Sequence, residues 1–340
     1  GKKNWFKDEE NKKGVFRLRF ETENEVPGAA FLGKKGEKMT AIRTSFMSGE
    51  DERQYMIRED YEIYEKYGAP TGATALHYHD FYELIYILDG EFSSLVDNVT
   101  YFLKKGDFLL IGRNVLHKYH FIEGKHARSR RIVLWITRQM LERLSGGEQD
   151  LSLCMERGKG AVYHFPPHYE GILRDLLVRA AMTDVPDLEG MRGKRLYDRA
   201  QLTLFFLYLN ELCEKEAFSS GEKTRVHHEL VDRVNDYIEG HMQEAISLDE
   251  LAEQAHMSKY HFLRRFKELT GTTVHVYLNN KRLIRCCELL QEGEAVGTVW
   301  GRCGFADYSS FLRNFRKEYG MSPTSYKTYL GKRESAISEG

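Results

Sequence analysis

The fold is decided by Gly304-Phe305-Ala306-Asp307-Tyr308-Ser309-Ser310-Phe311-Leu312-Arg313-Asn314-Phe315-Arg316-Lys317, a stretch near the end of the chain. Phe311 and Phe315 lie four residues apart, which is the spacing of side chains on one face of a helix. Asp307 stands where a helix needs a side chain to accept a free backbone N–H, and Gly320 provides a C-terminal stop. The stretch therefore predicts a short helix with one buried aromatic face.

A related pattern occurs earlier in the chain, from Leu248 to Gly271, whereas the copy just described runs from Val296 to Gly320. In order, the residues Leu248, Leu251, Met257, Ser258, Phe262, Phe266, Gly271 and Tyr277 correspond to Val296, Val299, Phe305, Asp307, Phe311, Phe315, Gly320 and Tyr326, with one additional residue in the turn of the second copy. Ser247 and Glu250 have the spacing of a capping box, which predicts a helix start. Each copy thus predicts two short helices joined by a turn, and so regular a repeat indicates a tandem helix-turn-helix.

The outer face of the second helix in each copy carries charge of one sign. From Lys259 to Lys267 there are four Lys or Arg residues and no acid, and from Tyr308 to Lys317 there are three and no acid. A merely solvated helix normally mixes charge signs, whereas Arg, Leu, Lys and Ser on one face suit guanine, thymine methyl and phosphate groups of a major groove. The predicted DNA contacts are Tyr260, Leu263, Arg264, Lys267, Tyr308, Ser309, Leu312, Arg313 and Arg316. A plain surface helix explains one such face, but two in tandem favour DNA.

The stretch from about Val226 to Tyr329 resembles the DNA-binding domain of AraC-type transcription regulators. The resemblance rests on the run quoted first and on the Gly320-Met321-Ser322-Pro323 and Tyr326 that close it. It implies two recognition helices on one rigid unit, which enter successive major grooves on one face of the DNA. One departure is Trp300, beside Gly301, where the family usually has Ala; a bulky ring there can shift the second recognition helix.

Length and composition indicate two globular domains. The chain has 340 residues, 41% of them hydrophobic, and a net charge of −1. The part from Arg225 to Arg333 carries 16 basic and 14 acidic residues, so the sequence is not that of a nonspecific DNA-coating protein. We find no N-terminal signal segment and no apolar run long enough to span a bilayer, which predicts a cytoplasmic protein with no membrane partner.

The cysteines show no metal-binding or disulfide pattern. They are Cys154, Cys213, Cys286, Cys287 and Cys303, without any C-x-x-C spacing. This usage predicts reduced, buried thiols. A redox sensor at the adjacent Cys286 and Cys287 is the less favoured alternative.

Leu76 to His120 predicts several short strands, with turns at Asp89-Gly90, Asp97-Asn98 and Lys105-Gly106. Further strands are expected at Tyr61–Lys66 and Arg131–Ile136, and a short helix at Ser48–Ile57. Such strands fit a small barrel or sandwich. In the run that begins at His77, alternate residues share one side of the sheet, so His77, His79 and Glu83 point the same way, while Tyr82 and Tyr86 pack under a helix or against a partner.

Two His, a Glu and the later His117 form a plausible metal constellation. Their spacing resembles the cupin pattern, although Gly112 and Asn114 replace its Pro and Gly. AraC-type regulators often carry a cupin-like N-terminal domain, and the resemblance implies that His77, His79, Glu83 and His117 contact a small-molecule effector, such as a sugar, without holding metal. No catalytic residue, metal or cofactor is predicted. Two alternatives stay open: these residues merely line the barrel, or the protein is a metal-dependent cupin enzyme with an appended helical domain.

The middle of the chain predicts helices at Tyr169–Met182 and Leu188–Phe218. The second contains Leu202 to Leu209, which is apolar nearly all round and must be covered on several sides. By resemblance, helices after the barrel form a homodimer; wholly intramolecular packing is the alternative. Ser219–Thr224 suggests a linker. An opening helix with Val231, Val234, Tyr237 and Ile238 follows, and Tyr277–Leu290 predicts a rigid connector that holds the two units about 34 Å apart.

We therefore predict an α+β multidomain protein, with an N-terminal cupin-like β-barrel followed by helices and a C-terminal all-α double helix-turn-helix. The expected regions are 1–165 (effector barrel), 166–218 (dimerisation helices), 219–225 (linker) and 226–333 (DNA-binding domain). The expected function is a DNA-binding transcription regulator that responds to a small-molecule effector, with double-stranded DNA and a second copy of the chain as partners. A helical scaffold that binds protein is a third hypothesis, which salt dependence of binding distinguishes.

Overall fold

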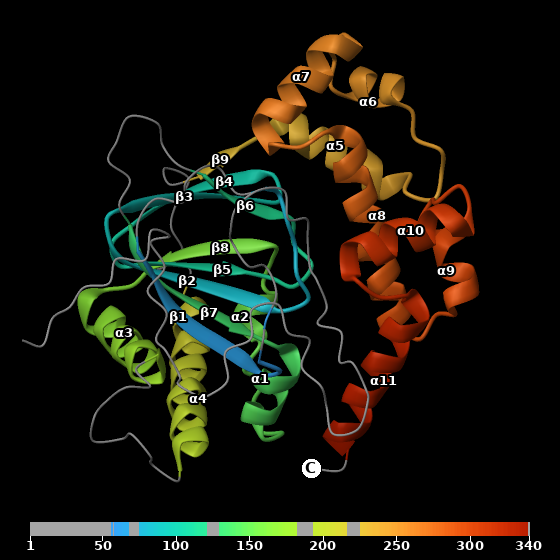
Figure 1. The fold of residues 1–340 in the computed structure, drawn as a ribbon. Helices are drawn as coiled ribbons and strands as arrows, with labels where there is room; N and C mark the ends of the chain where they lie inside the picture. The colour runs from blue at the N-terminus through green and yellow to red at the C-terminus, as the bar shows by residue number, and fades with distance from the viewer. Residues whose placement is uncertain are drawn as a thin grey trace, which may run out of the picture.

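The computed structural model describes residues 56, 58–67, 75–120, 129–181, 193–215 and 225–338. The predicted linker 219–224 and, apart from Met56, the predicted helix 48–57 lie outside these residues. The N-terminal strands form a sandwich, several helices cover one side of it, and a second group of helices lies beside it (Figure 1).

The strands form two antiparallel sheets. The strands of the larger sheet, in spatial order, are β1 (Tyr61–Tyr67), β7 (Arg130–Ile136), β2 (Tyr82–Asp89), β5 (Asp107–Ile111) and β8 (Gly160–His164). Those of the smaller sheet are β6 (His117–His120), β3 (Glu91–Val96), β4 (Val99–Lys104) and β9 (Arg225–His227). The predicted turns are confirmed: Asp97, Gly90 and Gly106 have positive φ values, which a tight reversal between strands requires.

Strand β2 lies between two apolar layers and is therefore almost continuously buried. Its residues Ile85 and Ile87 face the smaller sheet in one hydrophobic core. Leu84, Tyr82 and Tyr86 face the opposite way and pack under helices, as predicted. The hydroxyl of Tyr82 donates to Glu156, and that of Tyr86 donates to Glu170.

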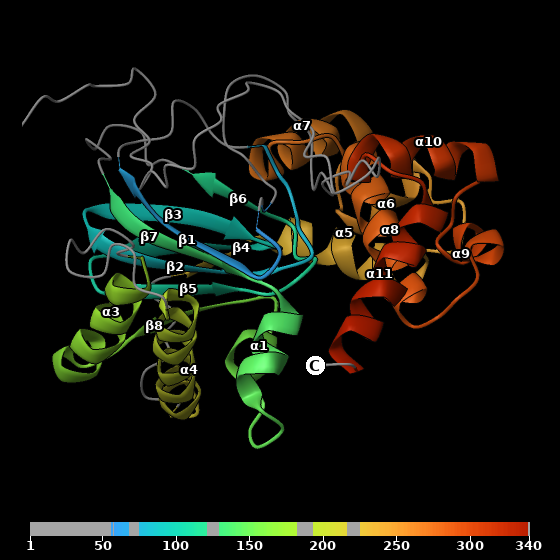
Figure 2. The ribbon, with the colours of Figure 1, turned by 60° about the horizontal axis from the view of Figure 1, so that its bottom comes forward.

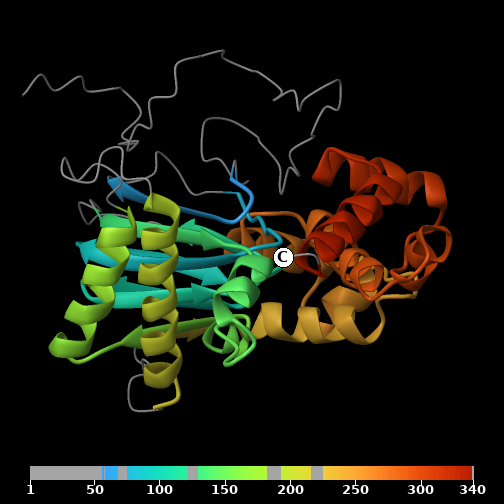
Figure 3. The same cartoon turned by 90° about the horizontal axis from the view of Figure 1, so that it is seen from below.

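The layer of helices against the larger sheet consists of α1 (Arg138–Ser145), α2 (Leu153–Glu156), α3 (Pro167–Ala181) and α4 (Lys194–Cys213). Figure 3 shows α3 and α4 lying next to each other across this sheet. Helix α4 confirms the predicted long helix over Lys194–Cys213, and residues 188–192 and 216–218 of that prediction lie outside the described residues. Its buried residues include Leu202, Phe205 and Leu209, because these face the sheet.

The C-terminal helices are α5 (Glu229–Gly240), α6 (Leu248–Gln254), α7 (Lys259–Thr270), α8 (Val274–Gln291), α9 (Val296–Arg302), α10 (Tyr308–Tyr319) and α11 (Pro323–Ser338). Helix α8 confirms the predicted connector, and Leu283, Cys286 and Leu290 are buried along it. The core of this unit also contains four side chains from the sandwich, namely Leu76, Tyr78, Leu95 and Leu116. The two parts therefore share one hydrophobic cluster.

Two details differ from the prediction. The α+β two-part architecture is confirmed, but among the described residues no hydrogen-bonded ladder joins the two sheets, so the predicted barrel is an open sandwich. Residues 225–227, expected at the end of the linker and the start of the DNA unit, form strand β9 at the edge of the smaller sheet. A three-residue edge strand has no periodicity that a sequence pattern could reveal.

Candidate DNA interface and candidate effector site

The first helix-turn-helix consists of α6, a turn at His256 and α7. Ser247 and Glu250 form the predicted capping box, with Ser247 N donating to the Glu250 carboxylate at 2.7 Å and Glu250 N donating to the Ser247 hydroxyl at 3.2 Å. His256 has φ of 54°, the left-handed conformation that reverses the chain between the two helices. Ser258 occupies the predicted N-cap position of α7, but its side chain accepts no capping hydrogen bond.

The second unit, α9 and α10, repeats the backbone hydrogen bonds of this turn, although its side-chain caps differ. Met257 N donates to Ala252 O at 3.0 Å in the first turn, and Phe305 N donates to Trp300 O at 3.1 Å in the second. Gly304, with φ of 77°, takes the place of His256. Asp307 caps α10 through Ser310 N at 2.7 Å. The duplication seen in the sequence is therefore a duplication of structure.

The residues predicted to contact DNA lie on the outer sides of α7 and α10. Tyr260, Arg264, Lys267, Tyr308, Ser309, Arg313 and Arg316 are exposed, and Leu263 and Leu312 are partly exposed. The aromatic residues at the four-residue spacing, Phe262 and Phe266 in α7 and Phe311 and Phe315 in α10, are fully buried. In Figure 2 both helices lie along the upper side of the helical unit. Neither recognition face is covered by the described part of the sandwich.

The basic side chains of the two faces are held differently. Arg264 forms an exposed ion pair with Glu268 at 3.7 Å, and Lys259 forms one with Asp249 at 2.9 Å. Arg313 and Arg316 form no ion pair with any described residue. Because exposed pairs contribute little stability, the cations of α7 can exchange these partners for phosphate or a base edge.

Trp300, the departure from the family pattern, lies on the outer part of α9. Its indole N–H donates to Gly297 O at 2.8 Å within the same helix, while the ring packs on the helical core. Val299, its neighbour, is the fully buried residue of α9. Any effect of the ring on DNA contact remains a prediction.

The second candidate site lies inside the sandwich, where the structure brings together all four predicted effector residues. His77, His79, Glu83 and His117 are at most 1% exposed. His77 and His117 form a β-bridge, and their ring centroids are 4.1 Å apart. The Glu83 Oε2 lies 3.4 Å from His79 Nε2 and 3.1 Å from His117 Nε2. We call these four residues the His/Glu cluster.

The hydrogen bonds around the cluster fix its orientation. The Nδ1 atoms of His77, His79 and His117 lie 2.8–2.9 Å from the carbonyl oxygens of Ala75, Phe81 and Val115, respectively. A carbonyl oxygen only accepts, so each Nδ1 carries the proton in the neutral ring, and each Nε2 presents a lone pair to the cluster.

Electrostatics favour the charged form of Glu83 and the neutral forms of His77 and His79. Burial alone would raise the pKa of Glu83, but His117 and His79 outweigh it and hold this pKa well below its ordinary value. Burial lowers the pKa of His77 strongly, and burial also lowers the pKa of His79 despite its hydrogen bond to Glu83. A group of electron-pair donors inside an apolar sandwich is the result.

Two functional neighbours were not identified from the sequence. Tyr119 OH donates to Glu83 Oε1 at 2.5 Å, and the indole N–H of Trp135 donates to the same oxygen at 2.9 Å. Trp135 is directly opposite Glu83 in the β2–β7 register. Only that long-range pairing places it in the cluster, and the pairing could not be read from local spacing. Asn114 explains one departure from the cupin pattern, because it adopts φ of 58° and its N–H donates to His79 O at 2.8 Å.

Comparisons with known proteins identify both parts of the chain. Residues 251–329 match the helix-turn-helix domain family, and residues 61–146 match the AraC-like ligand binding domain family. The HTH-type transcriptional activator RhaS of Escherichia fergusonii is 27% identical over 259 residues, 75% of this chain and 87% of RhaS. Both parts of the chain are therefore similar to AraC-type transcription regulators.

Two further similarities are narrower or weaker. The probable transcriptional regulator LumQ of Photobacterium leiognathi is 39% identical to this chain over 98 residues, 28% of this chain and 40% of LumQ. The solved structure of ToxT from Vibrio cholerae O395 is 13% identical, covers 80% of this chain and 99% of its own, and has a TM-score of 0.34.

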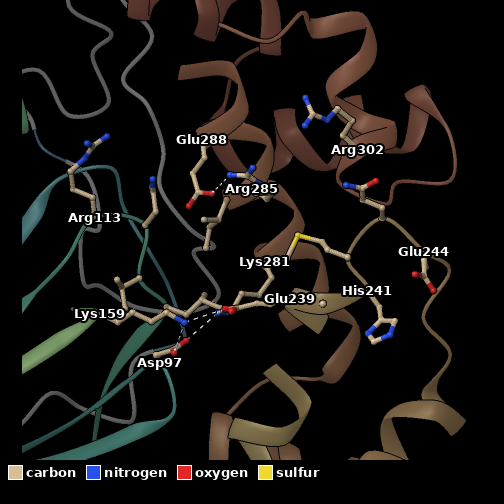
Figure 4. A pocket seen from close by; sticks show the side chains of 17 residues that line it. Asp97, Arg113, Lys159, Glu239, His241, Glu244, Lys281, Arg285, Glu288 and Arg302 are labelled. Carbon is tan, nitrogen blue, oxygen red and sulfur yellow. Dashed lines mark hydrogen bonds and ion pairs between the residues drawn. The ribbon is translucent and has the colours of Figure 1, made fainter. Parts of the chain in front are cut away.

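The match to the AraC-like ligand binding domain includes the whole His/Glu cluster, and charged residues join that domain to the helical unit. Asp97, in the β3–β4 turn, pairs with Lys281 of α8 at 3.1 Å and with Lys159 at 2.9 Å. Glu239 of α5 pairs with the same two lysines at 3.3 and 3.1 Å. Figure 4 shows this network at the edge of a groove of about 720 Å³ between the two parts.

The five cysteines are free and buried, as predicted. Burial raises the pKa of the Cys286 and Cys287 thiols, so neither presents the thiolate that a redox sensor requires. Of the helices in the described ranges, none combines the length and apolar character needed to cross a bilayer.

Proposed function

We propose that this protein regulates transcription by binding a specific DNA sequence through α7 and α10, in response to a small molecule bound in the sandwich. The observation that supports this most strongly is the structural repeat: two equivalent helices share one frame and both expose basic faces. Helices of this kind read base edges while neighbouring cations hold phosphates. We place this activity in the cytoplasm, as the sequence predicts.

The DNA contacts are tested with Arg264→Ala and Arg313→Ala. Each variant should lose about 1–3 kcal/mol of affinity for an operator selected with the wild-type protein, because an Arg–guanine pair is removed. Fluorescence anisotropy at fixed salt measures the loss. Arg233→Ala is the matched control, because Arg233 is an exposed arginine on α5, a helix that is not proposed to contact DNA. Unchanged affinity in both recognition-helix variants would refute the assignment.

We infer that the His/Glu cluster is the effector site and that its signal reaches the recognition helices directly. Tyr78 lies between His77 and His79, and its hydroxyl donates to that of Tyr319, the last residue of α10, at 3.0 Å. Lys118 follows His117, and a Cβ on Gly271, the C-cap of α7, would lie 2.9 Å from its Nζ. Each of the two segments thus presents a cluster histidine on one side and a recognition-helix contact on the other.

This arrangement favours regulation over the enzyme alternative. The cluster histidines are enclosed, whereas the two segments that carry them touch both recognition helices. A ligand that prefers one spacing of these segments would bias the placement of α7 and α10, which is what coupling between two sites requires. The prediction that the effector is a sugar stays a prediction, because no described residue selects one.

We also propose a homodimer that forms through α4. Its buried side packs on the larger sheet, but Leu196, Leu204 and Tyr208 on the other side are 71%, 45% and 44% exposed. Ala200 completes this stripe at four-residue spacing and is exposed as well. A row of apolar side chains on a solvent-facing helix is typical of a surface that a partner covers. A second copy would also supply a second pair of recognition helices.

A further inference from the structure

Three imidazole lone pairs and one carboxylate oxygen converge at the centre of the His/Glu cluster. The ligating atoms of His77, His79 and His117 all lie within 4.8 Å of one another. The Nε2 atoms of His77 and His117 are buried and make no hydrogen bond. For His117 this holds although Glu83 Oε2 is only 3.1 Å away, because the geometry is not that of a hydrogen bond.

This arrangement lacks a positive charge at its centre. Each Nδ1 uses the proton of the neutral ring to satisfy a backbone carbonyl, so Nε2 of His77 and Nε2 of His117 have none to share. Glu83 Oε1 is satisfied by Tyr119 and Trp135. Glu83 Oε2 faces Nε2 of His117 and Nε2 of His79, and the 3.4 Å contact with His79 is a hydrogen bond only when that ring carries a second proton. Buried electron-pair donors that face one another without a proton or cation between them are unfavourable. The geometry therefore calls for a cation.

The spacing fits a metal ion. Nitrogen and oxygen ligands at 2.0–2.1 Å in a tetrahedron around zinc lie about 3.3 Å apart. The distances from Glu83 Oε2 to His79 Nε2 and His117 Nε2 are 3.4 and 3.1 Å. The outer hydrogen bonds also match a metal site, in which each ligating histidine donates its other N–H to a carbonyl or carboxylate and the ligating carboxylate is itself hydrogen-bonded.

We propose that His77, His79, His117 and Glu83 bind one first-row transition-metal dication, and that this metal is the effector of the site assigned above or a part of it. Three imidazoles and a single carboxylate suit Zn²⁺, Fe²⁺, Mn²⁺ or Ni²⁺, whereas Ca²⁺ and Mg²⁺ prefer oxygen ligands. The regulatory part of the proposal rests on the proposed function; the metal site itself does not.

The regulatory consequence follows from the two segments that carry the ligands. Binding would draw His77 and His79 toward His117, and the adjacent residues Tyr78 and Lys118 contact the ends of α10 and α7. Metal binding should therefore change the affinity for operator DNA. Because the cluster is fully enclosed, entry and release need a local opening, and exchange with chelators should be slow.

The test uses the full chain, stripped by prolonged dialysis against EDTA and then titrated with ZnCl₂ or CoCl₂. We expect one equivalent per chain, a raised melting temperature, and cobalt ligand-field absorption bands typical of nitrogen and oxygen ligands. His79→Ala and Glu83→Gln should abolish the bands and the stabilisation. His168→Gln, at an exposed histidine on α3, is the control and should keep both.

A conservative variant guards against a folding defect. Trp135→Phe keeps an aromatic ring but removes the N–H that orients Glu83, so it should fold and bind metal about 10–100-fold more weakly. Equal metal binding by the wild type and by His79→Ala, or none by the wild type, would overturn the metal site. If metal binds but operator affinity is the same with and without it, the regulatory part fails. If the wild-type protein binds no operator DNA, with or without metal, the proposed function is overturned.

Discussion

At the scale of single residues, Lys118 is the least expected charge in the structure. Its side chain is 2% exposed, and no described carboxylate forms an ion pair with it. Burial lowers its pKa to about 8. Lys118 also acts on His228, whose pKa is lowered by burial and then by the positive charges of Arg265 and Lys118. The buried charge of Lys118 therefore destabilises the folded chain at neutral pH, and its side chain lies beside Gly271.

The predicted outcome is that Lys118→Met raises the free energy of unfolding at pH 7. An unfolded lysine has a pKa of about 10.4, so above pH 8 the unfolded chain binds more protons than the folded one, and wild-type stability gains from this group up to roughly pH 10. The advantage of the variant should shrink over that range in urea titrations. The control, Lys104→Met at an exposed residue of β4, should change stability by less than about 0.5 kcal/mol. A difference that is absent at pH 7, or that grows with pH, would contradict this explanation.

At the residue level, the sequence predicted positions correctly where a single repeat, such as two-residue alternation, determines which side a side chain faces. Strand alternation predicted that His77, His79 and Glu83 point to one side, and the structure does bring the three side chains together, although only Glu83 lies in a strand. Sequence reasoning failed for Trp135 and Lys118, because their roles depend on a strand register and on a docking surface that link distant segments. Neither the strand register nor the docking surface produces a pattern in neighbouring residues of the sequence.

At the scale of elements, two glycines of the second helix-turn-helix unit, Gly304 in the turn and Gly301 in α9, can be compared directly. A Cβ on Gly304 would lie 1.9 Å from Met242 O, and φ of 77° is itself strained for Ala, so Gly304→Ala should destabilise the helical unit by roughly 1–3 kcal/mol or more. Gly301, three residues earlier in α9, has nothing within 4 Å of such an atom. Gly301→Ala should therefore stabilise by about 0.5–1 kcal/mol. Thermal unfolding of both variants checks the pair, and equal effects would show that the turn is not packed as described.

Most helices could be predicted because the residues that begin and end them are close together in the sequence. The capping box at Ser247 and the left-handed stops at Gly271 and Gly320 fix helices within one or two residues. Strand β9 was missed because it exists only through its pairing with β4.

At the scale of the whole molecule, the exposed stripe on α4 predicts self-association. Leu204→Glu should convert the wild-type dimer to a monomer, because a carboxylate would be buried in an apolar interface. Sedimentation velocity at several concentrations measures the change. Phe102→Glu, which places the same charge on an exposed residue of β4, serves as the control and should leave the dimer intact. A monomeric wild type at high concentration would exclude the proposed interface.

The contact between Tyr78 and Tyr319 decides whether the sandwich and the recognition helices act as one body. Both side chains are buried, and their hydroxyls form a hydrogen bond of 3.0 Å across the shared core. Tyr78→Phe and Tyr319→Phe should each destabilise the chain, because each leaves the other hydroxyl buried without this bond. The double variant removes both hydroxyls, so its cost should fall short of the sum of the single costs by about 0.5–1.5 kcal/mol in a double-mutant cycle of urea unfolding. Matched titrations of operator affinity should show the same non-additivity, since the bond ends on α10. Additive costs within about 0.3 kcal/mol would mean that the two parts do not communicate through this bond.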